Sequence, residues 1–159
     1  MFTRIVWITA TIVVALDQLT KALAVHFLEG KQSVQVLGQF LQFSFARNPG
    51  AAFSFGTNAT IVFTLLAVVA IVFIVRFAPR VATNAWAIVF GGILGGAAGN
   101  LIDRLFRSPG VLRGHVVDFI ALPHYPMFNL ADSAIFCSAV LGIVLTLRGI
   151  APLTAKIES

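Results

Sequence analysis

The sequence predicts an all-α membrane protein with four transmembrane helices. A small β-sheet is expected between the first and second helices, and a long loop between the third and fourth. Hydrophobic residues make up 58% of the 159 residues and charged residues 11%, whereas a soluble domain carries about 25% charged residues. The mean hydropathy is +0.95. Soluble enzymes, disulfide scaffolds, disordered chains and coiled coils are therefore disfavoured, and we expect one membrane-embedded domain over residues 1–159.

The four spans follow from apolar runs of sufficient length. A bilayer core about 30 Å thick needs roughly 20 helical residues. The stretches that meet this length are 5–28, 59–76, 84–103 and 128–148. An even number of spans places both ends of the chain on one side of the membrane. The basic residues divide equally between the two sides, so the positive-inside rule alone gives no orientation.

The first span contains two charged residues, Asp17 and Lys21. They are four residues apart and therefore share one helix face. Two interpretations stay open: a mutually neutralising pair that anchors the span, or a direct role in a functional site. The segment also resembles a cleavable signal peptide that ends at Ala22-Leu23-Ala24. Because the charged pair lies between the apolar core and that site, we expect the segment to be retained.

The third span is rich in glycine. Gly91, Gly95 and Gly99 recur at a step of four residues, as do Gly92 and Gly96. Small residues at this step let helix backbones approach closely in a membrane. We therefore expect this span to pack tightly against its neighbours.

The two long connections lie on the same side of the predicted bundle. Within 29–58, residues 34–36 and 41–46 alternate between apolar and polar types, which predicts a two-stranded sheet at the membrane surface. Within 104–127, proline and glycine residues mark turns. We expect this second connection to act as a lid.

Several polar residues lie near the ends of the spans on that side. Asn100 and Arg104 share a helix face, and Asn129 followed by Asp132 is typical of a helix N-cap with an acid in the first turn. Asp118 is a lone carboxylate among apolar residues, and burial would raise its pKa. Two carboxylates at one boundary in different environments suggest acid–base chemistry with an activated water, as in aspartic proteases.

The other polar and reactive residues do not indicate catalytic or metal-binding roles. Asp103 is expected to pair locally with Arg107 and is given no catalytic role. Cys137, the one cysteine, is expected to be a small buried hydrophobic residue. No His or Cys cluster has metal-ligand spacing, so we expect no metal and no cofactor. The net charge of +5 comes from scattered residues, so nucleic acid is not expected as a partner.

Five segments resemble, in order, the signature blocks of the bacterial lipoprotein signal peptidase family, also called signal peptidase II. They are residues 17–21 (DQLTK), 48–54 (NPGAAFS), 99–104 (GNLIDR), 114–119 (GHVVDF) and 128–133 (FNLADS). The number of spans and the length also agree with that family. The resemblance covers nearly the whole chain, and five blocks in order are highly specific.

The resemblance implies an aspartic endopeptidase of the bacterial plasma membrane that cuts diacylglyceryl-modified prolipoproteins before the modified cysteine. It implies a monomer with cytoplasmic termini, an extracytoplasmic site in contact with membrane lipid, and inhibition by globomycin-type peptides. Asp118 and Asp132 would form the catalytic pair. The residues that would line or support the site are Asn48, Gly50, Asn100, Arg104, Asn129, Asp17 and Lys21.

Two other functions would account for part of this pattern. A small transporter or channel subunit would use the intramembrane charges as a conduction path, but such a path needs polar groups through the whole membrane depth. A purely structural membrane protein would leave the clustered asparagine and aspartate residues without a role. Presenilin-like and prepilin-cleaving aspartic proteases carry a GxGD block, and no Asp in this sequence directly follows a Gly.

Overall fold

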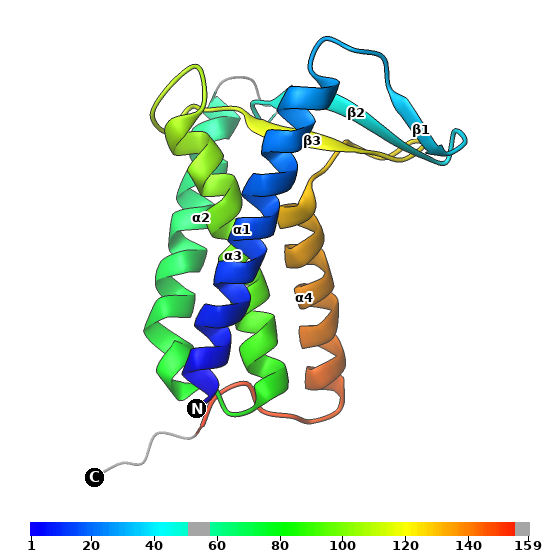
Figure 1. The fold of residues 1–159 in the computed structure, drawn as a ribbon. Helices are drawn as coiled ribbons and strands as arrows, with labels where there is room; N and C mark the ends of the chain where they lie inside the picture. Colours follow the sequence, from blue (N-terminus) through cyan, green and yellow to red (C-terminus); the bar gives the residue numbers. More distant parts are fainter. Residues whose placement is uncertain (51–57, 155–159) are drawn as a thin grey trace.

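The computed structural model describes residues 1–50 and 58–154. In this part of the chain, four long helices stand side by side, and a sheet covers the end of the bundle opposite the N-terminus (Figure 1). The helices are α1 (Phe2–Leu28), α2 (Asn58–Phe77), α3 (Asn84–Phe106) and α4 (Leu130–Leu147). Each is long and apolar enough to cross a membrane. Four long apolar helices at the predicted positions are confirmed, with ends that differ by a few residues from the predicted spans.

Helix α3 is the centre of the bundle, and its glycines explain why. It packs against α1, α2 and α4. A Cβ added at Gly91 or Gly95 would lie 2.6 Å from Thr9 Cβ or 2.7 Å from Val13 Cβ, both on α1. One added at Gly96 would lie 2.5 Å from the Ala131 carbonyl oxygen on α4. The two glycine rows therefore face two different helices, and the predicted close packing is confirmed on both sides.

The sheet has three antiparallel strands in the order β1 (Val34–Leu37), β2 (Leu41–Asn48) and β3 (Val116–Ala121). The expected hairpin of β1 and β2 is confirmed, but the expectation of only two strands is wrong. The third strand comes from the connection between α3 and α4. Its first four residues are buried, so the alternation that would mark a half-exposed strand is missing.

This third strand also bears on the expected lid over 104–127. Ala46 of β2 pairs with Asp118 of β3, and Asn48 pairs with Val116. Residues 116–121 are thus paired in the sheet, and the lid stays a prediction for the rest of the connection. The pairing has a second consequence, because it makes Asn48 and Asp118 diagonal neighbours on the two strands.

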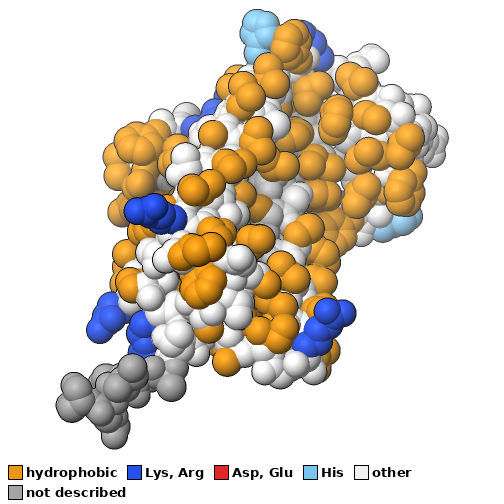
Figure 2. Space-filling view, turned by 60° about the horizontal axis from the view of Figure 1, so that its bottom comes forward, with side chains coloured by type: hydrophobic (Ala, Val, Ile, Leu, Met, Phe, Trp, Pro, Cys, Tyr) orange, Lys and Arg blue, Asp and Glu red, His pale blue; other side chains and the backbone are white. Residues whose placement is uncertain are grey.

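The outer surfaces of the helices are apolar. Figure 2 shows hydrophobic side chains spread over the bundle, with separate Lys and Arg side chains around them. Large exposed hydrophobic residues include Ile12 and Leu16 on α1, Val69 on α2 and Ile143 on α4. Cys137 is exposed on α4, so the expectation that it is buried was wrong. In a bundle this thin, a residue in an apolar run can face the surrounding lipid instead of another helix.

Candidate active site

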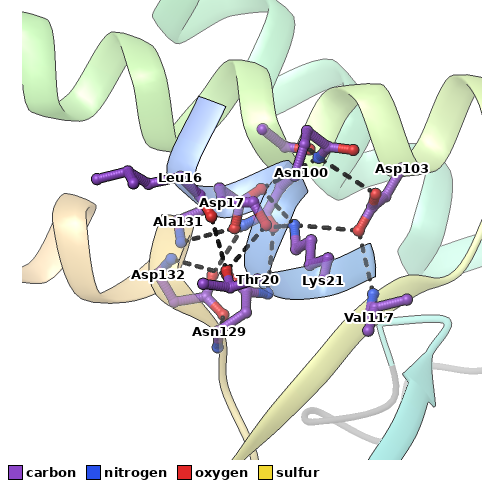
Figure 3. A network of polar contacts seen from close by, with 12 residues as sticks. Leu16, Asp17, Thr20, Lys21, Asn100, Asp103, Val117, Asn129, Ala131 and Asp132 are labelled. Atoms are coloured by element: carbon purple, nitrogen blue, oxygen red, sulfur yellow. Dashed lines mark hydrogen bonds and ion pairs between the residues drawn. The ribbon is translucent and has the colours of Figure 1, made fainter. Parts of the chain in front are cut away.

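Buried polar residues gather at the end of the bundle below the sheet. They come from α1, α3, β3 and the start of α4 (Figure 3). Their side chains are nearly or completely inaccessible to solvent: Asp17, Lys21, Asp103, Arg104, Asp118 and Asn129 are at most 7% exposed. Buried charges persist only where partners compensate for lost hydration, so the contacts within this cluster explain how the fold tolerates it.

Asp118 lies on β3 and is 2% exposed. Its Oδ2 accepts a hydrogen bond from Asn48 Nδ2 at 2.8 Å, and its Oδ1 accepts one from Asn129 Nδ2 at 2.7 Å. Burial raises the pKa of the Asp118 carboxyl to about 6, and the negative charge of nearby Asp132 acts in the same direction. The two amide donors oppose this rise only in part. The predicted direction of the shift is confirmed, and Asp118 can hold a proton at mildly acidic pH.

Asp132 lies in the first turn of α4, where a reciprocal capping box fixes it. Asn129 Oδ1 accepts from the Asp132 backbone N–H at 3.0 Å, and Asp132 Oδ2 accepts from the Asn129 backbone N–H at 3.2 Å. The predicted N-cap is confirmed. Asp132 Oδ1 accepts a further hydrogen bond from Asn100 Nδ2 at 2.8 Å. Because Asn129 also donates to Asp118, this one asparagine links the two carboxylates.

The three asparagines share one arrangement. In each, the side-chain oxygen is occupied by a donor, which turns the amide NH₂ group towards a carboxylate. Asn129 Oδ1 accepts from the Asp132 backbone, as described above. Asn48 Oδ1 accepts from the backbone N–H of Gly50 at 2.8 Å. Gly50 has φ +100°, a conformation that favours glycine.

The third asparagine, Asn100, is held by a charge. Its Oδ1 accepts from Lys21 Nζ at 2.9 Å. Lys21 Nζ also lies 2.8 Å from Asp17 Oδ2 and 3.0 Å from Asp103 Oδ2. Asp103 Oδ1 in turn accepts from Arg107 Nε at 2.6 Å. The predicted pairing of Asp103 with Arg107 is confirmed, but Asp103 is completely buried and also accepts from the backbone N–H of Val117.

Asp17 ties the first helix to the last. Its Oδ1 accepts from the backbone N–H of Ala131 at 3.0 Å, in the first turn of α4. Such N–H groups have no partner within their own helix. A Cβ on Gly99 would lie 2.5 Å from Asp17 Oδ2, so the glycine allows the contact. Asp17 and Lys21 do neutralise each other, but each also makes a contact outside the pair. Asp17 accepts from the start of α4, and Lys21 donates to Asn100.

Arg104 lies one turn after Asn100 on α3, beside a cavity of about 310 Å³ that Asn100, Asp132 and Phe63 also line. Its guanidinium carbon is 5.8 Å from the centre of the Phe63 ring, a cation–π distance. It lies close enough to attract both Asp118 and Asp132. Among the residues that the structure describes, its Nη1 has no hydrogen-bond partner. A buried guanidinium N–H at a cavity is suited to bind an oxygen of a ligand.

The fold brings together all nine residues that the sequence singled out. Residues 51–54 of the second signature segment lie outside the described residues. Gln18 is a cluster member to which the sequence analysis gave no role, and its Nε2 donates to Asp17 and to the Gly99 carbonyl at 3.1 Å. Its place in the first signature segment, residues 17–21, was the available signal. Among residues 1–50 and 58–154, no group of His, Cys, Asp and Glu side chains could hold a metal ion.

A bundle of spanning helices with buried carboxylates and amides at one end defines a multi-pass membrane protein. Comparison with known proteins then identifies the family. The family model described as "Signal peptidase (SPase) II" matches residues 9–148, and the chain belongs to this family.

The relatives agree. The chain is 52% identical to the lipoprotein signal peptidase of Leifsonia xyli subsp. xyli over 90% of this chain and 67% of the relative. It is 50% identical to the lipoprotein signal peptidase of Streptomyces coelicolor over 86% of this chain and 67% of that relative. Two solved structures described as bacterial membrane enzymes superpose with TM-scores of 0.77 and 0.76 at 27% and 29% identity. They cover 96% and 89% of this chain, and 93% and 91% of their own. The transporter interpretation is not favoured by these findings.

Proposed function

We propose that this protein is an aspartic endopeptidase that removes the signal peptide from diacylglyceryl-modified prolipoproteins. It cuts the peptide bond before the lipid-modified cysteine, with Asp118 and Asp132 as the catalytic pair. The observation that carries this proposal is the bridge through Asn129, which donates to Asp118 and caps the helix turn of Asp132. Membership in the signal peptidase II family supports the reaction class.

The chemistry follows from a carboxyl and a carboxylate acting together on one water molecule. Asp118, with a pKa of about 6, carries the proton in the reactive form, and Asp132 is the ionised partner. Asp132 takes a proton from water, whose oxygen attacks the peptide carbonyl carbon, while Asp118 donates its proton to the carbonyl oxygen. Collapse of the tetrahedral intermediate breaks the C–N bond. Asp132 passes the proton it took from water to the leaving nitrogen, and Asp118 recovers its proton from a hydroxyl of the intermediate, so one water is consumed per bond and both acids return to their starting states.

Some supporting residues hold the two catalytic carboxylates, and one binds the substrate. Asn48, Asn100 and Asn129 donate to the carboxylates and hold them in place. Gly50 orients Asn48. Arg104 binds a backbone carbonyl of the substrate through its Nη1, in the cavity next to Asp132.

A site at one end of the spanning helices suits a substrate that has a membrane-embedded signal helix and a lipid tail. We place this end on the extracytoplasmic side of the bacterial plasma membrane, with both termini in the cytoplasm. Membership in the family is the main support for this orientation, and the exposed basic residues add little. At the sheet end, Arg104 is buried and the side chains of Arg47 and Arg107 are in ion pairs, whereas Lys31 and Arg113 are exposed. At the opposite end, Arg4, Arg76 and Arg148 are exposed.

Further expectations come from the family. The protein acts as a monomer in contact with membrane lipid, and it uses no cofactor. Globomycin-type peptides inhibit it by occupying the cavity at Arg104 and Asp132.

The test is cleavage of a purified diacylglyceryl prolipoprotein by the detergent-solubilised protein, read as a mobility shift. Wild type is compared with Asp118→Asn, Asp132→Asn and, as a matched control, Glu29→Gln, which removes an exposed carboxylate from the same end. Thermal unfolding checks that each variant is folded. We expect cleavage by wild type and by the control alone. Cleavage by a folded Asp118 or Asp132 variant would remove that residue from the pair. No cleavage by folded wild type would overturn the proposed function.

A further inference from the structure

Lys21 is a buried charge whose neutralisation does not require the proposed catalytic residues. Its exposed fraction is 0%, and its ammonium group lies between Asp17 and Asp103 (Figure 3). Arg107 balances the second acid. The two acids and two bases therefore sum to zero formal charge. The third contact of Lys21, to Asn100 Oδ1 at 2.9 Å, is not needed for this balance.

That third contact determines how the Asn100 amide is turned. An ammonium group has three donors and no acceptor, whereas an asparagine side chain has one acceptor end and one donor end. Asn100 must therefore present its oxygen to Lys21 and its NH₂ group to the opposite side. On that side the NH₂ group donates to Asp132 Oδ1 at 2.8 Å. The reversed amide would place a donor against the ammonium group and an oxygen against the carboxylate.

We propose that Lys21 is a positioning residue for catalysis, which acts by fixing the Asn100 amide so that it donates to Asp132. This inference rests on the proposed function. Without Lys21, Asn100 Oδ1 keeps only a longer contact of 3.3 Å from Asn129 Nδ2. That NH₂ group donates at 2.7 Å to Asp118, so it holds the Asn100 oxygen weakly and the Asn100 amide turns between two orientations. Only one of them donates to Asp132. Lys21 does not line the cavity formed by Arg104, Asn100 and Asp132, so it affects the chemical step and not substrate binding.

Lys21→Met alone is a poor test, because it leaves two buried acids with only Arg107 to balance them, and unpaired buried charges unfold proteins. The double variant Asp17→Asn/Lys21→Met avoids this problem. It leaves the Asp103–Arg107 pair intact, and the amide introduced at position 17 still offers a carbonyl oxygen to the Ala131 N–H.

A matched control removes the other half of the cluster. The double variant Asp103→Asn/Arg107→Gln also deletes one acid and one base from buried or half-buried positions. It keeps Lys21 in contact with Asp17 and Asn100. Both double variants therefore remove one acid and one base from the same cluster, and only the first removes the ammonium group that donates to Asn100 Oδ1. The amide introduced at position 103 still offers a carbonyl oxygen to the Val117 N–H or to Lys21.

The measurements are kcat and KM for prolipoprotein cleavage. Misplacement of a catalytic group by about 1 Å can cost about 100-fold in rate. We expect kcat of Asp17→Asn/Lys21→Met to fall by at least about tenfold at nearly unchanged KM, whereas the control keeps its kcat within about threefold. Adding Asn100→Ala to the first double variant should lower kcat no further than Asn100→Ala does alone, because both changes act through one amide.

Several results would overturn the role of Lys21. The first is an unchanged kcat in folded Asp17→Asn/Lys21→Met. The second is a fall of kcat in the control variant as large as in that variant. The third is a further fall of kcat when Asn100→Ala is added, by the full factor that Asn100→Ala causes alone. If the first double variant does not fold, Asn100→Asp decides, since its carboxylate still accepts from Lys21 but cannot donate to an ionised Asp132. Retained kcat in that variant overturns the proposal. In each case wild type and the Asp118 and Asp132 variants report separately on the proposed function.

Discussion

The raised pKa of Asp118 predicts how the stability of the protein depends on pH. The carboxyl group ionises at about 6 in the folded protein, against an ordinary value of 3.8. Each pKa unit corresponds to about 1.4 kcal/mol, so the difference amounts to about 3 kcal/mol. Below pH 3.8 the group is protonated in both states. Between pH 3.8 and about 6 the unfolded chain releases the proton first, and stability falls as pH rises. Above about pH 6 the loss is complete.

The perturbation that isolates this effect is Asp118→Asn. The variant has no proton to release, so wild type should lose about 3 kcal/mol of unfolding free energy relative to it between pH 3 and 7. The absolute difference at one pH is less informative. Asn48 and Asn129 both donate to residue 118, and the NH₂ group of the new asparagine opposes one of these donors at a cost of about 1–3 kcal/mol.

The assay is equilibrium unfolding in mixed detergent micelles across this pH range, with Val117→Ala as the control. Val117 is completely buried on the same strand and does not titrate, so its variant should differ from wild type by the same amount at every pH. If the difference between wild type and Asp118→Asn is also constant with pH, the burial argument for Asp118 is wrong. A difference that grows in favour of wild type as pH rises refutes its sign.

The remaining predictions concern packing, binding and catalysis. Gly92→Ala should destabilise the bundle by about 1–3 kcal/mol, because its Cβ would overlap the Ser138 hydroxyl oxygen. Adding Ser138→Ala should restore stability in thermal unfolding, whereas Gly95→Ala meets the Ala10 backbone oxygen at 2.8 Å and should have no such suppressor at that position. Arg104→Gln should raise KM for prolipoprotein more than it lowers kcat, in steady-state cleavage. The pH–rate profile should be bell-shaped, since Asp118 must stay protonated, and a rate that is flat across the acidic range contradicts this. A chelator should leave cleavage unchanged, measured with EDTA against untreated protein.

The sequence predicted the helices well because hydrophobicity is a local signal. Each of the four spans is an apolar run that needs no information about distant residues. The missed strand, β3, shows the limit of this reasoning. Its partner β2 lies about 70 residues earlier in the chain, as in the pairing of Ala46 with Asp118. Its burial on both faces removes the period-two pattern that identified β1 and β2.

The same distinction applies to the site. The capping box of Asn129 and Asp132 was visible because its residues are three apart. The spacing of Asp103 and Arg107 correctly predicted a pair, but it did not reveal that Asp103 is buried against Lys21. That contact depends on how α1 and α3 pack. Gln18 was missed for the same reason, since its partners lie up to 85 residues away.

The packing of the helices is a condition for the geometry of the carboxylate pair. Asp17 can reach the Ala131 N–H at the start of α4 because residue 99 between them is a glycine. Any side chain at that position would displace the Asp17 carboxylate. Loss of this contact would free an N–H of the helix turn that carries Asp132, and it would also release one of the three oxygens around Lys21. The glycine rows of α3 thus do more than bring helices together: they set the position of the charges that orient Asn100, and through it Asp132.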